Sequence, residues 1–461
     1  MVVDWSQICD EAVQHLQALV RIDTSNPPGN ELAAAEYLAG AFAREGLSPL
    51  ILKSSSTRGS IITRLRGSGE QPALMMMAHL DVVPANAQEW THAPFGGDLI
   101  DGFVWGRGTV DCKGLVVANL MVVLLCQRLG VPLKGDLTYM AHADEESSDF
   151  AYGLSWLARE HPELLDAPFA LYEGAGDELT IAGKRVQTVA TAEKGWCTVE
   201  VVTRGQGGHS SVPHLDNPLF HMAPLLLRLQ KTKMPVHVTQ TVARFAQGLG
   251  ELFVDTDYTS GLFRQMADPT TAEAALQQLP IEESQRVWFD ALLRNTATPT
   301  MIQGANSRWA LPSEARLTLN GRVLPGQSAQ DFDAELRAIL GTEAKYCIEG
   351  FQEGVECQID SPVFRSIQRV MARRTPDVPV IPVLMTGGTE RNLLKEIGMQ
   401  VYSFWPRRME PSVPSVMQMA HGVDERISVD NLLYATQCLF EIVCDLNRIN
   451  HQPIGERGCH A

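Results

Sequence analysis

Histidine and acidic residues that could bind a metal ion recur at the ends of short apolar segments. His79 and Asp81 end the segment Leu-Met-Met-Met-Ala-His-Leu-Asp, residues 74–81, whose apolar run predicts a strand buried on both faces. Because side chains two apart on a strand point to the same side, the imidazole and the carboxylate leave the strand together. They are a candidate metal ligand and its orienting partner, and a structural histidine capped by an acid is the alternative.

A second candidate ligand is Asp111, which lies between a glycine-rich strand segment and an apolar helix expected over 113–129. Glycines on both sides allow a close approach of the backbone, which suits a ligand at this position. A helix N-cap is the alternative role for this aspartate.

Three glutamates follow two further expected strands. Glu145 and Glu146 come after the strand at 137–141, and Glu173 ends a short apolar strand that begins at Phe169. Glu145 and Glu146 are neighbours whose side chains point apart, so we expect them to have different roles. A charged, solvated turn is the alternative for this pair.

All of these residues fall at or just beyond the carboxyl ends of expected strands, where open α/β sheets place their ligands. Histidine and carboxylate ligands without thiolates suit zinc, cobalt or manganese. The acids outnumber what one ion requires, which favours two divalent ions that share a bridging carboxylate.

Composition excludes several other classes of protein. The chain has 461 residues, of which 45% are hydrophobic and 20% charged, as in soluble globular proteins with two or more domains. A formal net charge of −16 argues against nucleic acid or an anionic membrane as a partner. No transmembrane helix or export signal is expected. The nine cysteines form no CxxC pair, which favours a reducing compartment and a cytoplasmic location.

The order of expected elements predicts two kinds of structure in one chain. Helices at 6–20, 31–45 and 113–129 and strands at 60–65, 74–81 and 137–141 form an α/β pattern. Near Glu193 the pattern changes to amphipathic strands and helices in mixed order, typical of an α+β insert. Strand-like segments at 378–384 and 401–404 resume the first pattern.

Six motifs, taken together, make the chain resemble a known family. They are residues 75–81, 105–114, 141–146, 171–174, 207–210 and 420–427. In this order they resemble the aminoacylase, carboxypeptidase and succinyl-diaminopimelate desuccinylase family of dinuclear metallohydrolases. The resemblance implies a three-layer α/β catalytic domain with a mixed, mostly parallel sheet, formed by 1–193 and 355–461. A smaller α+β lid, 194–354, would interrupt it and make a homodimer.

The resemblance also implies the metal ligands. Asp111 would bridge two divalent ions, most simply zinc, with cobalt or manganese also compatible. His79 and Glu173 would hold one ion, and Glu146 and His421 the other.

Further roles carried by the resemblance concern catalysis. Asp81 would orient the His79 ring through its second nitrogen, and Glu145 would be the general base for a metal-bound hydroxide. His209, in Gly-Gly-His-Ser-Ser, would stabilise the oxyanion from the lid, in relatives often that of the partner subunit. A cis peptide bond after Asp111 is also implied. His142, by contrast, is expected to be a core residue.

Two departures from the family pattern affect the substrate site. Relatives commonly have Gly-Gly-Thr-Asp-x-Arg where this chain has Gly-Gly-Thr-Glu-Arg-Asn at 387–392, so Asn392 occupies the usual arginine position and Arg391 comes one residue early. Trp309 aligns with a common asparagine. We therefore treat Arg391, Asn392 and Trp309 as candidate substrate-binding residues of an altered site.

The sequence as a whole predicts a metal-dependent hydrolase that cleaves an amide bond in a dipeptide or an N-acyl amino acid. The alternative is a catalytically silent binding or scaffold relative whose substrate contacts have drifted. A serine hydrolase is less compatible, because no G-x-S-x-G motif occurs.

Overall fold

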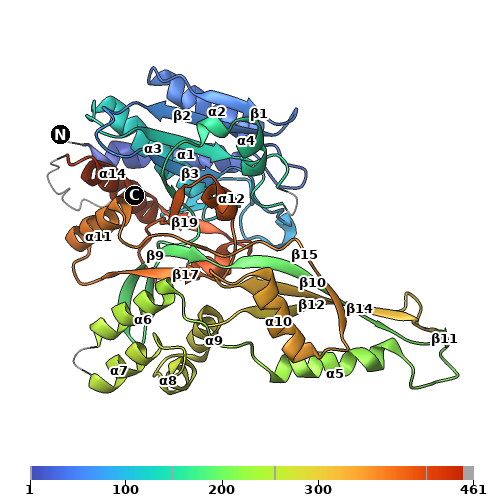
Figure 1. Ribbon diagram of the computed structural model, residues 1–461. Helices are drawn as coiled ribbons and strands as arrows, with labels where there is room; N and C mark the ends of the chain where they lie inside the picture. Colours follow the sequence, from blue (N-terminus) through green and yellow to red (C-terminus); the bar gives the residue numbers. More distant parts are fainter. Residues whose placement is uncertain (1–2, 148–149, 254–255, 412, 450–461) are drawn as a thin grey trace.

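A computed structural model describes residues 3–147, 150–253, 256–411 and 413–449, and its largest element is a ten-stranded mixed sheet (Figure 1). The strand order is β1-β2-β6-β3-β7-β18-β9-β16, with β17 and β8 also paired to β9. Parallel pairing joins β6 to β3, β3 to β7, β7 to β18 and β9 to β17. The strands are β1 (Leu50–Lys53), β2 (Gly59–Leu65), β3 (Leu74–His79), β6 (Leu137–His142), β7 (Phe169–Tyr172), β8 (Glu178–Ile181), β9 (Lys184–Glu193), β16 (Val355–Glu356), β17 (Val380–Met385) and β18 (Gln400–Ser403).

Strand β3 is buried along its whole length, as the apolar run predicts. Alternate residues serve the two faces: Met76 and Ala78 belong to one hydrophobic cluster, and Met75 and Met77 to another. Helices cover both faces, which confirms the three-layer α/β prediction. The first cluster includes side chains of α1 (Trp5–Arg21), α2 (Glu31–Arg44), α3 (Lys113–Arg128), α11 (Pro362–Arg374) and α14 (Val429–Leu446); the second includes side chains of α4 (Leu154–Glu160) and α12 (Arg391–Glu396).

A four-stranded antiparallel sheet forms most of the projection at the lower right of Figure 1. Its order is β12-β14-β10-β15, and one face packs against two helices through residues such as Met222 and Phe332. A two-stranded ribbon ends the projection. The elements are β10 (Gly195–Arg204), β12 (Thr296–Gln303), β14 (Glu314–Val323), β15 (Lys345–Glu349), helices α5 (Pro218–Lys231) and α10 (Ala329–Leu340), and the ribbon strands β11 (Gly208–His209) and β13 (Ala310–Leu311).

Lys194 is the single residue between β9 of the large sheet and β10 of the small one. The strands between 194 and 354 form the small sheet and the ribbon, but four helices of the same segment do not pack there. Phe245 and other residues of these helices share a cluster with Ala190 and Val383 of the large sheet. Part of the segment expected to be a lid thus covers β9 and β17. These helices are α6 (Gln240–Leu252), α7 (Asp257–Gln265), α8 (Ala272–Gln278) and α9 (Glu283–Leu292).

The remaining elements have three or four residues each. A small three-stranded sheet joins β19 to β5 and β5 to β4, which brings residues near 426 next to those near 105. Among the described residues, no helix is long and apolar enough to cross a membrane. The elements are β4 (Asp98–Ile100), β5 (Phe103–Trp105), β19 (Arg426–Ser428), α13 (Val416–Met419) and the 3₁₀ turns η1 (Ala87–Glu89) and η2 (Pro162–Leu164).

Candidate metal centre

The imidazole of His79 lies at the carboxyl end of β3 and faces two carboxylates. Its Nε2 atom is 3.1 Å from Asp111 Oδ1 and 3.6 Å from Glu173 Oε2. The ring is fully buried. Burial acts to lower the pKa of His79, but Cys112, Glu173 and Asp111 around it raise the pKa well above its usual value. The ring therefore lies in a negative field that favours a cation at this position.

A second imidazole, that of His421, comes from the loop after α13. Its Nε2 atom lies 3.3 Å from Asp111 Oδ2 and 3.1 Å from each oxygen of Glu146. Hydrogen bonds with Asp111 and then Glu146 raise the pKa of His421 to about 10. The backbone at His421 is left-handed, with φ of 61°. His421, which is 275 residues after Glu146 along the chain, thus meets the strand ends through tertiary structure alone.

Asp111 lies between the two imidazoles, with one carboxylate oxygen toward His79 and the other toward His421. Contacts on both oxygens are what a bridging carboxylate requires. The peptide bond between Asp111 and Cys112 is cis, as the family resemblance implies.

Glu425 fixes the backbone that carries Asp111. Its buried carboxylate accepts hydrogen bonds from the N–H groups of Gly108, Val110 and Asp111 at 2.9, 2.7 and 2.9 Å. Arg107 donates to the same carboxylate at 2.8 Å. The sequence analysis included Glu425 within a family motif but gave it no role, because nothing local indicates that it holds a loop more than 300 residues away.

The contact between Asp81 and His79 differs in detail from the one expected. His79 Nδ1 lies 2.9 Å from the backbone oxygen of Asp81 and 3.6 Å from its carboxylate Oδ1. The carboxylate instead accepts the backbone N–H groups of Glu145 and Glu146 at 3.1 and 2.9 Å. Asp81 therefore contacts His79 mainly through its carbonyl, and its side chain holds the turn that carries both glutamates.

Glu145 and Glu146 have the different surroundings that their adjacency predicts. Glu146 faces His421, whereas Glu145 can bring a carboxylate oxygen within 4.8 Å of ligand atoms of both His79 and Glu146. Burial raises the pKa of Glu145, and Glu173 raises it further. A carboxylate with a raised proton affinity next to a metal centre suits a general base.

Two groups of side chains fit a pair of divalent ions. His79, Asp111 and Glu173 place ligand atoms within 4.8 Å of one another, and so do Asp111, Glu146 and His421. Asp111 is common to both, and imidazole and carboxylate donors suit zinc, cobalt or manganese. Cys112 lies beside the first group; burial raises the pKa of its thiol, and its Sγ contacts the backbone N–H and carbonyl of His79.

Arg391 does not occupy the position expected of a substrate-binding group. It is fully buried, and its guanidinium donates to the carbonyl of Val401 and to Ser403 Oγ and lies 3.9 Å from Glu193. A substrate contact was expected from the sequence. In the structure α12 begins at this residue and turns its side chain toward β18. Asn392 is half-buried on the same helix, and its role stays a prediction.

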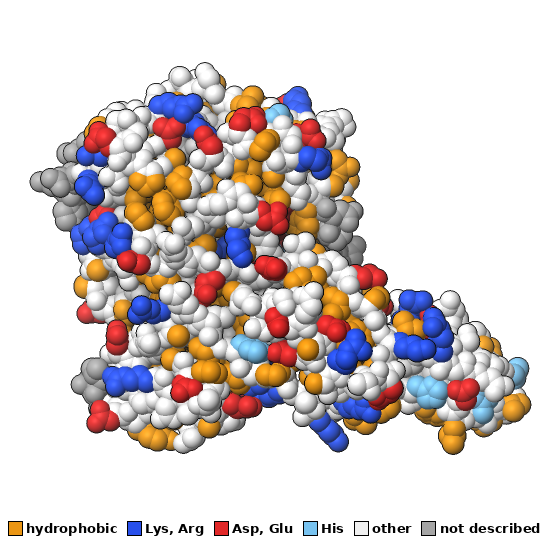
Figure 2. Space-filling view, in the orientation of Figure 1, with side chains coloured by type: hydrophobic (Ala, Val, Ile, Leu, Met, Phe, Trp, Pro, Cys, Tyr) orange, Lys and Arg blue, Asp and Glu red, His pale blue; other side chains and the backbone are white. Residues whose placement is uncertain are grey.

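His209, on β11, and Trp309, in the turn directly before β13, lie at the far end of the projection from β3 (Figure 1). Both are exposed, and the Trp309 side chain is 70% exposed. Histidine and apolar side chains gather at this tip in Figure 2. The two residues are therefore not brought to the metal ligands within one chain. His142 is confirmed as a core residue, since Tyr172 and the carbonyl of Ala143 bond its buried ring.

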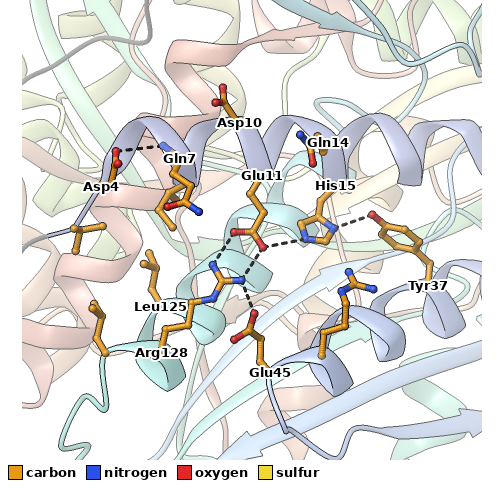
Figure 3. Close-up of a pocket in the computed structure, with 14 residues that line it drawn as sticks. Asp4, Gln7, Asp10, Glu11, Gln14, His15, Tyr37, Glu45, Leu125 and Arg128 are labelled. Atoms are coloured by element: carbon orange, nitrogen blue, oxygen red, sulfur yellow. Dashed lines mark hydrogen bonds and ion pairs between the residues drawn. The ribbon is translucent and has the colours of Figure 1, made fainter.

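A separate surface cleft of about 750 Å³ opens between α1, α2 and α3 (Figure 3). Its polar groups pair with one another: Arg128 bridges Glu11 and Glu45, and His15 bonds the Tyr37 hydroxyl at 2.8 Å. The cleft shares no residue with the metal centre, and these pairings leave little polar capacity for a ligand.

Comparison with known proteins shows the family to which this chain belongs. The family model for Peptidase family M20/M25/M40 matches residues 75–445. The human N-fatty-acyl-amino acid synthase/hydrolase PM20D1 is 24% identical over 450 residues, which cover 94% of this chain and 86% of the human protein.

Solved structures show the same fold. An M20 family metallo-carboxypeptidase from Sulfolobus solfataricus aligns with a TM-score of 0.70 at 20% identity, covering 95% of this chain and 100% of that chain. A dinuclear metal binding peptidase of the M20 family from Bacillus subtilis aligns with a TM-score of 0.61 at 12% identity, covering 96% and 99%. With most of its length matched by the family model, this chain belongs to peptidase family M20/M25/M40, a family of dinuclear metal-binding hydrolases that cleave C–N bonds.

Proposed function

We propose that this protein hydrolyses the amide bond of a dipeptide or an N-acyl amino acid, with two divalent ions and Glu145 as general base. The observation that carries the proposal is the placement of Asp111 between His79 and His421, with Glu145 at the same strand edge. The names of the relatives agree, since one is an N-fatty-acyl-amino acid synthase/hydrolase and another a metallo-carboxypeptidase.

The ions, when bound, would polarise the amide carbonyl and lower the pKa of a water molecule. His79, Asp111 and Glu173 would hold one, and Asp111, Glu146 and His421 the other; zinc fits this donor set, and cobalt and manganese also suit it. Glu145 Oε accepts a proton from the attacking water and returns it to the leaving amine nitrogen as the C–N bond breaks. Asp81 keeps Glu145 in place through the backbone of its turn.

A carboxylate on the substrate requires a cation, and we assign this role to Arg322 of β14 rather than to Arg391. The Nη1 atom of Arg322 lies 3.1 Å from the position that a Cβ on Gly388 would take, next to Trp196. Its Nε donates to Asn320, and among the described residues no acid lies within ion-pair distance of it. A half-buried guanidinium without a counter-ion is suited to bind a carboxylate bidentately.

The test is hydrolysis of a panel of dipeptides, short- and long-chain N-acyl amino acids and their carboxamides, by protein loaded with zinc, cobalt or manganese. We expect metal-dependent turnover that Glu145→Gln lowers by about 10²- to 10⁴-fold without loss of metal. Arg322→Gln should raise KM for free carboxylates but not for carboxamides, whereas Arg316→Gln, on the same strand, should change neither. Metal binding without turnover of any member of the panel would favour the catalytically silent alternative.

We also propose that the protein is a homodimer whose lid supplies His209 to the partner's site. Support comes from the exposed edge strand β12 with Met301 and Ile302, and from Phe220 and Leu227 on α5, all more than 50% exposed. Light scattering tests the dimer. Mixing Glu145→Gln subunits with His209→Ala subunits should restore activity, because one site in each mixed dimer then has both residues; no recovery would place His209 in its own chain's site.

A further inference from the structure

A chain of buried polar groups continues from Asp81 away from the metal ligands. Asn26 Nδ2 donates to Asp81 Oδ2 at 2.8 Å and to Asp144 Oδ1 at 3.0 Å, so one amide joins two carboxylates. Arg58 then donates to Asp144 at 2.7 Å, and to both oxygens of Glu31 at 2.8 and 2.6 Å. Each of these five residues is at most 5% exposed.

The network holds the turn that carries the glutamates at two points. Asp81 accepts the N–H groups of Glu145 and Glu146, as described above. Asp144, directly before them, has a left-handed backbone with φ of 69°, and its carboxylate receives the N–H of Tyr152 at 2.8 Å. A non-glycine residue keeps such a backbone only where its surroundings fix it.

Arg58 is the cation of this network. The described residues include no other lysine or arginine within 4 Å of Glu31 or Asp144, and Asp81 adds a third buried acid. Buried carboxylates are stable only when they are paired and hydrogen-bonded. Without Arg58, Asp144 would keep the hydrogen bonds from Asn26 and Tyr152 but would be a buried carboxylate without a counter-ion.

We propose that Arg58 is a positioning residue that, clamped between Glu31 and Asp144, fixes the turn presenting Glu145 and Glu146 to the metal centre. The proposal rests on the proposed function for the roles of those glutamates. It extends the site to Glu31 of α2 and to Asn26 of the loop before it.

Gly29 offers a way to disturb Arg58 without altering any side chain of the network. A Cβ on Gly29 would lie 2.3 Å from Arg58 Nε and 2.4 Å from Cζ, so Gly29→Ala must displace the guanidinium. Gly46 is the matched control: its φ of 74° is close to the 83° of Gly29, but a Cβ there has nothing within 4 Å. Both substitutions carry the same left-handed backbone penalty, and only one moves Arg58.

The first experiment titrates cobalt into both metal-free variants and follows the cobalt absorption band and the dissociation constants, then measures kcat. We expect Gly29→Ala to weaken binding of one ion and to lower kcat, each about tenfold. This is the lower end of the decrease in metal affinity or activity seen when a residue that supports a metal ligand is lost. Gly46→Ala should stay within twofold of the unaltered protein. Equal behaviour of the two variants, in binding and in the cobalt spectrum, would overturn the proposal.

A second pair of variants replaces the guanidinium itself. Arg58→Lys keeps the charge but lacks the planar guanidinium that donates to both oxygens of Glu31 and to Asp144. Arg64→Lys is the control, because it alters an arginine of the following strand whose partners, Asp166 and Asp136, are outside the network. We expect about a tenfold loss in cobalt affinity for the first and none for the second. If Gly29→Ala and Arg58→Lys both fail to fold while the controls fold, Arg58 serves stability alone and the proposal is wrong. Cobalt binding is measured without substrate, so the two proposals can fail separately. Absence of amide hydrolysis would refute the proposed function, and the cobalt affinities would still test the role of Arg58.

Discussion

Replacing Arg391 by Met separates a structural role for this residue from a role in substrate binding. The guanidinium is fully buried and bonds the Val401 carbonyl and Ser403, next to the buried Glu193. Burial raises the pKa of Glu193 to about 7, and Arg391 is the largest influence acting to lower it. The substitution therefore removes the charged donor to the Val401 carbonyl, which keeps only the weak Cys357 thiol among side-chain donors, and leaves the Glu193 carboxylate without its cation.

The loss in free energy of unfolding caused by Arg391→Met depends on pH because Glu193 titrates. Loss of the charged hydrogen bond from Arg391 to the Val401 carbonyl costs about 2 kcal/mol at any pH. The folded-state pKa of Glu193 lies above its ordinary value of 4.5, so below about pH 7 the carboxyl is protonated in the fold and the charge pair adds nothing. Above pH 7 the unaltered protein ionises Glu193 against Arg391, whereas the variant must keep it protonated, at up to about 1.36 kcal/mol per pH unit. We expect a total loss of about 2 kcal/mol at pH 6 and of about 4 to 5 kcal/mol at pH 9.

Urea unfolding of metal-loaded protein at pH 6 and pH 9 measures this loss, with KM determined on the folded variant. Arg391→Met combined with Glu193→Gln is the control, because the second change removes the carboxylate and should abolish the pH dependence. An unchanged free energy of unfolding at both pH values, together with a KM raised tenfold or more, would show that Arg391 binds substrate and that the structural role is wrong.

Three further predictions concern the metal centre, the lid and the junction between the sheets. Removal of metal by a chelator should lower stability, and a metal concentration of 100 times Kd should restore about 2.7 kcal/mol per site, as measured by thermal unfolding. His209→Ala should reduce kcat about 10²- to 10³-fold with unchanged metal content; loss of metal would make it a ligand instead. Burial lowers the pKa of Lys194 to about 7, so the fold binds fewer protons than the unfolded chain between pH 7 and 10.5. The free energy of unfolding of the unaltered protein should therefore rise by about 3 to 4 kcal/mol relative to that of Lys194→Met between pH 7 and pH 10. Urea unfolding at both pH values measures this, and a difference between the two proteins that does not change with pH would contradict the prediction.

The metal ligands could be predicted because a parallel sheet converts local patterns into a shared location. His79 and Glu173 each follow an apolar run, and parallel pairing of β3 with β7 brings the ends of these runs to one edge. The strands alone, however, give no reason for His421 to be there. Its assignment came from the family motif, because a loop residue has no periodicity that indicates its neighbours.

The supporting contacts could not be predicted, since they join segments that carry no common pattern. Arg58 precedes β2 by one residue and resembles any polar residue before a strand, yet it is buried with Glu31. Arg391 comes two residues after Gly387-Gly388-Thr389, a segment without helical periodicity, but the helix that begins at Arg391 turns its side chain into the core. Likewise, the apolar face of α6 predicts a helix but does not say which of two sheets it covers.

The charges at the strand edge connect metal binding to acidity. Asp111, Glu146 and Glu173 meet His79 and His421, and without a cation the site holds protons: hydrogen bonds with Asp111 and Glu146 raise the pKa of His421 to about 10. A histidine must be neutral to bind a metal, so near pH 7 an ion entering this position displaces the His421 proton. Metal affinity should therefore rise with pH up to about 10, with a slope approaching tenfold per unit for each proton released. The same exchange explains why carboxylates that repel one another can remain together, because either protons or divalent ions offset their charge in the folded protein.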